Sequence, residues 1–275
     1  KMKIFVTGGT GFVGKNFLSL ASKENKIYAV TRRKNNNKIK NVKYLHGKLS
    51  NKWDTYLKKS DVLIHFAATG VKNQNQNLEK CVDFNVLESL KLLLNAYKNN
   101  LTNWIVIGTS SEYGMTLEKN IKVSVNDILL PCTNYSISKK MFFDIIYNTA
   151  LSLNINLIYF RLFPVYGANE PIHRLIPQII EHSKKRKKLI INNSNIRIDY
   201  SNVTDVCNKI LKSSKFLDIE DKYPQVWNLA SGNIITIEDF IKKYIKKNNI
   251  NIKIKYNKNK KPLMHHISKK NSIWT

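Results

Sequence analysis

Short apolar runs alternate with longer helical patterns through the first two thirds of the chain, and this alternation constrains the fold most strongly. Most of the runs are apolar throughout, which is typical of strands covered on both faces. The alternation predicts an α/β fold with a doubly wound parallel sheet. The predicted strands are Ile4–Thr7, Ile27–Thr31, Val42–His46, Val62–Phe66, Trp104–Ile107 and Leu157–Phe160, and the predicted helices are Phe12–Ser22, Leu78–Lys98 and Asn134–Ser152.

A glycine-rich segment, Thr7–Gly14, follows the first predicted strand and opens the first predicted helix. In it, Gly8, Gly11 and Gly14 recur at every third position. Gly8 permits a tight turn, Gly11 lets the backbone approach a pyrophosphate at the helix N-terminus, and Gly14 lets the helix pack closely. The flanking strand and helix predict a dinucleotide-binding Rossmann sheet. The alternative is a glycine-rich turn that binds nothing.

The last third of the chain mixes helices with short strands. Helical patterns cover residues 172–182, 205–217 and 237–247, and strand patterns cover residues 189–191 and 227–229. We therefore predict a dinucleotide-binding Rossmann domain over residues 1–165. A smaller mixed lobe over residues 166–275, interleaved with the first domain, is predicted to bind the substrate.

The second predicted strand ends in Thr31, Arg32 and Arg33, with no acidic residue. An NAD site usually places a carboxylate here to bind the ribose 2′-hydroxyl. Two of the six arginines of the chain stand there instead, and a guanidinium suits a 2′-phosphate. The segment predicts NADP(H) in preference to NAD(H). The alternative is that both arginines belong to the solvated, lysine-rich loop that follows.

The chain is strongly basic, with 46 lysines and arginines against 19 acids and a net charge of +27. Nearly all of the excess is lysine interspersed with asparagine, as on a solvated surface, whereas proteins that read nucleic-acid bases depend on arginine. No apolar run approaches the roughly 20 residues of a membrane helix. We expect no nucleic-acid and no membrane partner, and the basic field favours an anionic small substrate.

The cysteines and histidines suggest neither a disulfide framework nor a metal site. Cys81, Cys132 and Cys207 are far apart and odd in number, which suits a reducing cytoplasm. The pair His265 and His266 has no cysteine or carboxylate beside it, so we expect surface residues and no metal. The chain begins directly with a strand pattern, which also predicts a cytoplasmic protein.

Tyr135 and Lys139 form a Tyr-x-x-x-Lys pattern at the start of a predicted helix. The i,i+4 spacing places phenol and ammonium on one face. A nearby ammonium, and the positive ring of an oxidised nicotinamide, would lower the pKa of the phenol and make Tyr135 a usable general acid or base. Thr109 ends another predicted strand at the edge where such sheets bind ligands, so its hydroxyl can share the substrate oxygen.

Together these segments resemble the extended short-chain dehydrogenase/reductase family, in its NAD(P)-dependent epimerase/dehydratase group that acts on nucleotide sugars. The resemblance covers roughly residues 2–245 and implies an enzyme in which Tyr135 is the acid/base, Lys139 contacts the nicotinamide ribose and Thr109 is the hydroxyl partner. It also implies a homodimer built from the helices 78–98 and 135–152. The matching segments are 7–14, 61–68, 85–86, 109–114, 135–139, 161–167, 197–200, 203–206 and 227–232.

The loop, the arginines and the resemblance together give two predicted sets of binding residues. The cofactor set is Thr7, Gly8, Gly11, Phe12, Val13, Thr31, Arg32, Arg33, Leu49, Phe66, Ala67, Ala68, Thr69, Asn85, Tyr135, Lys139, Phe163 and Val165. The substrate set is Ser110, Ser111, Tyr135, Arg174 and Arg197, the last of which the resemblance places near the nucleotide diphosphate.

Two departures from the family pattern are informative. Family dehydratases usually carry an acid pair where this chain has Ser110 and Ser111. Glu112 comes one place late and should point elsewhere on an extended segment, which argues against a 4,6-dehydratase. Lys48 stands where the family has an aspartate that binds the adenine, so the resemblance supplies no adenine-binding residue at this position.

These features predict an NADPH-dependent reductase of a nucleotide-linked 4-keto-6-deoxy sugar, similar to synthases of CDP-linked dideoxyhexoses for surface polysaccharides. Two alternatives stay open. One is a C4-epimerase that uses the same residues with tightly held NAD, and the other is a non-catalytic dinucleotide-binding sensor or subunit.

Overall fold

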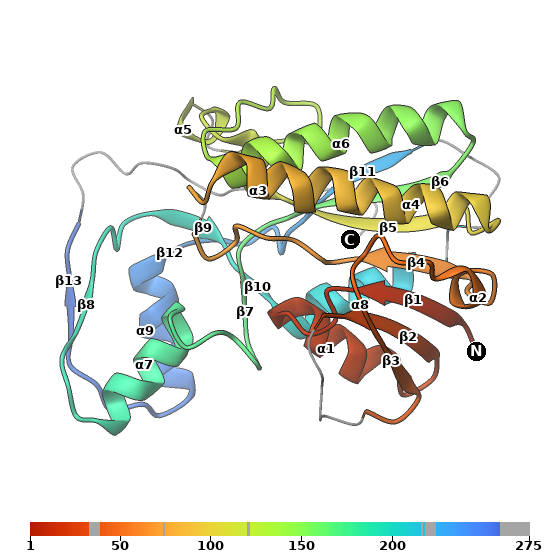
Figure 1. Cartoon of the computed structure of the whole chain (residues 1–275). Helices are drawn as coiled ribbons and strands as arrows, with labels where there is room; N and C mark the ends of the chain where they lie inside the picture. The colour runs from red at the N-terminus through yellow and green to blue at the C-terminus, as the bar shows by residue number, and fades with distance from the viewer. Residues whose placement is uncertain (33–38, 74, 120–121, 216, 218–223, 259–275) are drawn as a thin grey trace.

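The computed structural model describes residues 1–32, 39–73, 75–119, 122–215, 217 and 224–258 (Figure 1). Its centre is a seven-stranded sheet in which every neighbouring pair of strands is parallel. The strands are β1 (Lys3–Thr7), β2 (Lys26–Thr31), β3 (Val42–His46), β4 (Val62–His65), β5 (Asn103–Thr109), β6 (Asn156–Leu162) and β11 (Gln225–Leu229). Their spatial order is β11-β6-β5-β4-β1-β2-β3, so the chain reverses direction across the sheet between β1 and β4.

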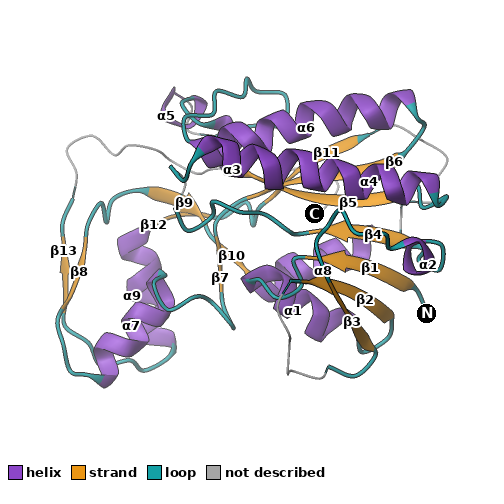
Figure 2. Ribbon diagram, in the orientation of Figure 1, coloured by secondary structure: helices purple, strands orange, loops and turns teal. Residues whose placement is uncertain are grey.

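Helices cover both faces of this sheet, as Figure 2 shows. On one face lie α1 (Phe12–Ala21) and α8 (Val203–Ser213), and on the other lie α3 (Leu78–Val82), α4 (Ser89–Lys98) and α6 (Asn134–Ser152). Short helices α2 (Asp54–Leu57) and α5 (Thr116–Lys119) complete this part. The predicted doubly wound α/β fold is confirmed. No helix among the described residues combines the length and apolarity needed to cross a bilayer.

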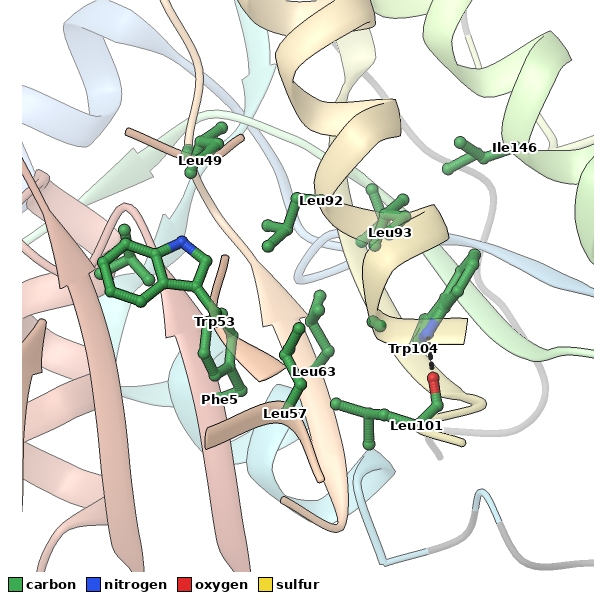
Figure 3. Close-up of a cluster of buried hydrophobic side chains, with 14 of the residues drawn as sticks. Phe5, Leu49, Trp53, Leu57, Leu63, Leu92, Leu93, Leu101, Trp104 and Ile146 are labelled. Atoms are coloured by element: carbon green, nitrogen blue, oxygen red, sulfur yellow. Dashed lines mark hydrogen bonds between the residues drawn. The ribbon is translucent and has the colours of Figure 1, made fainter. Parts of the chain in front are cut away.

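Side chains of β1 alternate between two apolar cores. Phe5 points into one core, and Ile4 and Val6 point into the other, because successive residues of a strand face opposite sides. Figure 3 shows the Phe5 side, where Leu92 and Leu93 of α4 pack toward the sheet. Trp104 is buried there, and its indole nitrogen donates a 2.7 Å hydrogen bond to the Leu101 carbonyl, which removes the penalty for burying that donor.

The predicted helix 78–98 is interrupted by a π-helical segment, Asp83–Glu88, between α3 and α4. The wider turn directs Asn85 inward, where its side chain accepts from the Thr69 amide at 2.8 Å and donates to the Thr69 carbonyl at 3.1 Å and the Ser138 hydroxyl at 2.9 Å. Such single π-turns often accompany functional sites. Here the turn holds the loop that follows β4.

Six asparagines adopt the left-handed backbone conformation that glycine usually supplies. They are Asn41, Asn100, Asn154, Asn169, Asn193 and Asn249. Of the ten glycines in the chain, several occupy places with no room for a Cβ atom.

A smaller lobe lies at the carboxyl edge of the main sheet (Figure 1). Its elements are α7 (Leu175–Lys184), α9 (Ile237–Lys247) and the strand pairs β7 (Val165–Tyr166) with β10 (Ser201–Asn202), β8 (Leu189–Ile191) with β13 (Ile254–Tyr256), and β9 (Arg197–Asp199) with β12 (Ile234–Thr236). It has its own core, which includes Ile176, Ile179, Phe240 and Ile241. The same part of the chain also supplies strand β11 to the main sheet and helix α8 to one of its faces. Residues 259–275 lie outside the described residues.

His65, at the end of β4, is buried and lines no part of the cavity described below. Its Nδ1 lies 2.8 Å from the Thr7 hydroxyl, and its Nε2 lies 3.1 Å from the Ser89 hydroxyl. Burial, with a smaller contribution from Lys139, lowers the pKa of the imidazole to about 3. The ring is therefore neutral in the folded protein over the whole physiological range.

The two isoleucines Ile179 and Ile180 provide a matched test of the lobe core, because they are neighbours on α7 with 0% and 36% exposure. We expect Ile179→Ala to lower the free energy of unfolding by about 2–5 kcal/mol, through lost burial and the cavity left behind. Ile180→Ala should cost less than about 1 kcal/mol. Urea denaturation of both variants measures the difference, and equal losses would contradict this packing.

Acid should destabilise the protein through His65. The unfolded imidazole binds a proton below its ordinary pKa near 6.5, whereas the folded one stays neutral down to about 3. Stability is therefore intact above the unfolded value and falls as the pH drops toward about 3. Between about pH 7.5 and about pH 4.5, the wild type should lose on the order of 2 kcal/mol more than His65→Asn in urea denaturation. An identical loss in both proteins would assign the acid sensitivity to other groups.

Candidate functional site

The glycine loop after β1 leaves an open anion cradle at the N-terminus of α1. Gly8 has a φ of +69°, and a Cβ atom there would lie 2.5 Å from the Ala67 nitrogen. A Cβ on Gly14 would lie 2.2 Å from the Gly8 carbonyl oxygen, so α1 packs against the turn as closely as a backbone can. The first residue before α1, Gly11, offers no side-chain cap. The first amides of α1 are thus available to a pyrophosphate, and these residues fit the dinucleotide that the sequence predicts.

A cavity of about 750 Å³ opens at the carboxyl ends of the central strands. A volume of this size suits a cofactor or a nucleotide-linked ligand. Among the described residues that line it there is no aspartate or glutamate, while Lys72, His173 and Arg174 bring basic groups to its wall. The wall therefore favours an anionic ligand. Of the predicted residues, the cavity lining contains Gly8, Gly11, Phe12, Val13, Phe66, Ala68, Thr109, Ser110, Ser111, Tyr135, Phe163, Val165 and Arg174.

Two of the three predicted catalytic residues, Thr109 and Tyr135, line this cavity, and Lys139 is buried behind its wall. Thr109 ends β5 and Tyr135 lies in the first turn of α6, and the two side chains hydrogen-bond to each other. The start of α6 is fixed by a capping box, in which the Ser136 amide donates to the Thr133 hydroxyl at 3.1 Å. One helical turn beyond Tyr135, the Lys139 ammonium donates to the Ile107 carbonyl at 2.9 Å.

Burial dominates the electrostatics of the two titratable groups. Tyr135 is 7% exposed, and burial, followed by the negative charge of Glu112, raises the pKa of its phenol well above the usual value. Lys139 is 1% exposed, and burial lowers its pKa to about 8, against the opposing charge of Glu112. The lowering of the phenol pKa that the sequence suggests is not produced by the chain alone. At neutral pH Tyr135 is a protonated hydroxyl, ready to donate.

Several predicted cofactor residues support the cavity from behind. Thr7 is buried against His65, Ala67 is buried beside Gly8, and Thr69 is held by Asn85. Thr31 is buried at the end of β2. Leu49 packs in the apolar core with Trp53 and does not line the cavity.

Of the two arginines predicted to select the cofactor, the structure describes Arg32, directly after β2. Arg32 is exposed, and its guanidinium carbon lies 4.8 Å from the centre of the Phe84 ring. Arg33 lies outside the described residues. Lys48, at the position where the family usually has an acid, is exposed, and its backbone amide donates to the Asn51 side chain at 3.2 Å.

On the substrate side, Arg174 lies at the cavity and Arg197 does not. The Arg174 guanidinium is 3.3 Å from the Glu170 carboxylate and 5.8 Å from the centre of the Phe12 ring. Arg197 is exposed on β9, and the cavity lining does not include it. Substrate binding by Arg197 therefore stays a prediction that the cavity does not support. For Arg174 it stays a prediction that the position of the residue on the cavity wall supports.

The segment after β5 differs from the extended conformation that we expected. Ser110–Tyr113 forms a 3₁₀ turn, because Thr109 and Glu112 close a capping box around it. Ser110 and Ser111 line the cavity, and Glu112 points away from it into the interior. Its direction agrees with the prediction, but the conformation that produces it does not.

Several other residues that line the cavity were not among the predicted site residues. They include Val71, Lys72, Cys132, Thr133, Ser136 and His173. Lys72 lies in the loop between β4 and α3, and His173 directly precedes Arg174. Their positions after a predicted strand and beside a predicted site residue could have suggested them. Within the described residues, no group of three histidine, cysteine or acidic side chains could hold a metal ion, and His265 and His266 lie outside that part of the chain.

Comparison with known proteins agrees with this geometry. UDP-glucose 4-epimerase of Mycoplasma genitalium is 27% identical over 93% of this chain and 85% of its own length, and CDP-abequose synthase of Salmonella typhimurium is 26% identical over 88% and 79%. GDP-6-deoxy-D-talose 4-dehydrogenase of Aggregatibacter actinomycetemcomitans is 28% identical over 80% and 72%.

The fold is shared with solved structures of the same kind. UDP-N-acetylglucosamine 4-epimerase from Methanobrevibacter ruminantium superposes with a TM-score of 0.85 at 22% identity, covering 99% of this chain and 91% of that one. The family model described as "NAD dependent epimerase/dehydratase family" matches residues 4–230. The match covers most of the chain, and the chain therefore belongs to the NAD dependent epimerase/dehydratase family.

Proposed function

We propose that this protein is an NADPH-dependent reductase of a nucleotide-diphosphate-linked 4-keto-6-deoxy sugar, in the synthesis of precursors for surface polysaccharide such as lipopolysaccharide or capsule. The observation that carries the proposal is the placement of Thr109 and Tyr135 on the wall of a cavity that has basic groups and, among its described lining residues, no carboxylate. Such a cavity accepts a nucleotide diphosphate and presents two hydroxyls to one reacting oxygen.

In this reaction the bound dinucleotide supplies a hydride. The protein supplies the proton, because Tyr135 is protonated at neutral pH and lies at the cavity wall. Thr109 would hold the carbonyl oxygen by a second hydrogen bond, because its side chain and Tyr135 both line the cavity. Lys139 is anchored on the Ile107 carbonyl, and its ammonium orients the cofactor ribose and stabilises negative charge that develops on the phenol.

The same cavity argues against dehydration. Removal of a carbon-bound proton and expulsion of a hydroxyl would require an acid and a base beside Tyr135. Ser110 and Ser111 stand where family dehydratases usually place acids, and Glu112 is buried away from the cavity. Serine hydroxyls suit hydrogen bonds to a sugar and are poor proton carriers.

For the cofactor we propose NADP(H), because Arg32 and Arg33 follow Thr31 in the sequence and no acid stands there to bind a ribose 2′-hydroxyl. NAD is the alternative, since the family description names it and the related structure MoeE5 was solved with NAD, at a TM-score of 0.83 and 19% identity.

The second candidate is a nucleotide-sugar C4-epimerase, which the names of the epimerase relatives favour. It would use the same three residues with tightly held NAD. A non-catalytic dinucleotide-binding sensor or subunit is the third candidate, and the complete Thr109, Tyr135 and Lys139 set argues against it.

The proposal extends to assembly and location. Exposed apolar side chains on α3, the π segment and α6 would suit a homodimer formed through these helices; they are Leu78, Leu87, Met141, Ile145 and Leu151. Cys81, Cys132 and Cys207 are all free thiols, which supports a location in the cytoplasm.

Replacing Tyr135 by phenylalanine removes one hydroxyl and little volume. We expect Tyr135→Phe to keep NADPH binding and to lower single-turnover NADPH oxidation with a 4-keto nucleotide sugar by about 10²–10⁴-fold. Tyr147→Phe, on the same helix α6, is the matched control and should match the wild type. A wild-type rate in Tyr135→Phe would assign the acid elsewhere. Interconversion of two nucleotide hexoses without NADPH consumption would establish the epimerase instead.

The cofactor preference can be tested with the double variant Arg32→Ala, Arg33→Ala. Loss of charge-assisted contacts to a 2′-phosphate, worth about 1.5–3 kcal/mol, should weaken NADPH binding by about tenfold or more. NADH binding should change little. Fluorescence titration with both cofactors measures the ratio, with the exposed Lys40→Ala as control. Equal weakening of both cofactors would mean that these arginines do not read the 2′-phosphate.

A further inference from the structure

Glu112 is an acid with 0% exposure, and the proposed reaction does not use it. Its Oε1 accepts hydrogen bonds from the Thr109 amide at 2.8 Å and from the Tyr159 hydroxyl at 2.7 Å. Its Oε2 accepts from Arg161 Nε at 3.2 Å. Three donors from β5 and β6 therefore hold this carboxylate in one orientation directly behind the cavity wall.

The partners of Glu112 are themselves fixed. Arg161 also donates to the Val125 carbonyl at 2.9 Å, and Tyr113 donates to the Asn228 side chain at 2.6 Å. The network thus joins β5, β6 and β11 with the loop before α6. Burial raises the pKa of Glu112. The guanidinium of Arg161, which is always charged, contacts the carboxylate where both side chains are buried, and this contact favours the ionised form of Glu112.

Gly108 provides the space that the carboxylate occupies. A Cβ atom on residue 108 would lie 2.5 Å from Glu112 Oε1 and 2.3 Å from the Tyr159 hydroxyl oxygen. Any other residue at position 108 would displace both groups. The glycine at position 108, next to Thr109, therefore leaves the space in which the Glu112 carboxylate and the Tyr159 hydroxyl lie.

The first link from Glu112 to the site is mechanical. Glu112 caps the amide of Thr109, while the Thr109 hydroxyl accepts from the Ser111 amide at 3.2 Å. Together these contacts form the capping box that sets the rotamer of Thr109. The same hydroxyl hydrogen-bonds to Tyr135, so the position of Glu112 determines where both hydroxyls meet.

The second link is electrostatic. The negative charge of Glu112 favours the protonated forms of both Lys139 and Tyr135 on α6. The other titratable or charged groups that face Glu112 are Tyr113 on its own turn and Tyr159 and Arg161 on β6. His65 faces Lys139 and is neutral.

We propose that Glu112 is a positioning residue that orients Thr109 toward Tyr135 and holds a fixed negative charge behind the cavity wall at the start of α6. This role rests on the proposed use of the three residues with a dinucleotide cofactor. Glu112 itself touches neither substrate nor cofactor, because the lining of the cavity excludes it.

The charge is tested by Glu112→Gln, with NADPH as the probe. Fluorescence titration of NADPH from about pH 6 to about pH 10 should show wild-type affinity falling as Lys139 loses its proton. In Glu112→Gln, that midpoint should move to lower pH by about half a unit or more, because the charge that favours the ammonium is gone. Tyr159→Phe removes a hydrogen bond from the same carboxylate but no charge, and its midpoint should stay at the wild-type value. An unchanged midpoint in Glu112→Gln would overturn the proposal.

The positioning is tested by Glu112→Asp, which keeps the charge and withdraws the carboxylate from the Thr109 amide. We expect kcat with a 4-keto nucleotide sugar to fall about tenfold or more, with little change in KM for NADPH. An unchanged kcat in Glu112→Asp would overturn the proposal. This test stands on its own if thermal melting shows that Glu112→Gln does not fold. If the wild type binds NADPH but reduces no 4-keto sugar, the proposed reaction is wrong, and the titration midpoints still decide the role of Glu112.

Discussion

The close approach of α1 to the turn after β1 is the contact on which the rest of the structure depends. With a glycine at residue 14, the helix backbone reaches the Gly8 carbonyl, and Phe17 and Leu18 enter the core beside Ile4. Strand β1 is thereby joined to α1, the helix that α8 packs against. Asn16 of the same helix donates to the Ala168 carbonyl at 2.7 Å, which ties the smaller lobe to it. A displaced helix would separate the cradle, the core and the lobe together.

Features encoded by contiguous residues could be predicted from the sequence. The periodicity of apolar residues predicted the parallel sheet, and short patterns predicted the glycine loop and the Tyr135–Lys139 pair, because backbone geometry and helical spacing act locally. The π-turn could not be predicted, since it depends on Asn85 reaching Ser138, which is 53 residues away. The 3₁₀ turn was missed although its capping box joins residues only three positions apart, because we expected the chain to stay extended after the strand.

Charge is distributed around the cavity in an ordered way. Basic groups such as Lys72 and Arg174 lie on its wall, the neutral hydroxyls of Thr109 and Tyr135 lie deeper, and the carboxylate of Glu112 lies behind them. Burial shifts the pKa values of Tyr135 and Lys139 in opposite directions, upward and downward, because it favours the neutral form of each group. The surface excess of lysine attracts anions in general, whereas this arrangement decides where in the cavity negative charge can be stabilised.

The six left-handed asparagines have a consequence for the unfolded chain. At such turns an asparagine strains the folded backbone slightly more than a glycine, but it leaves the unfolded chain fewer conformations to lose. The two effects oppose each other, so these turns are formed at a lower entropic cost than glycine turns. Glycine is then left for positions such as 8, 14 and 108, where the neighbouring atoms exclude a side chain altogether.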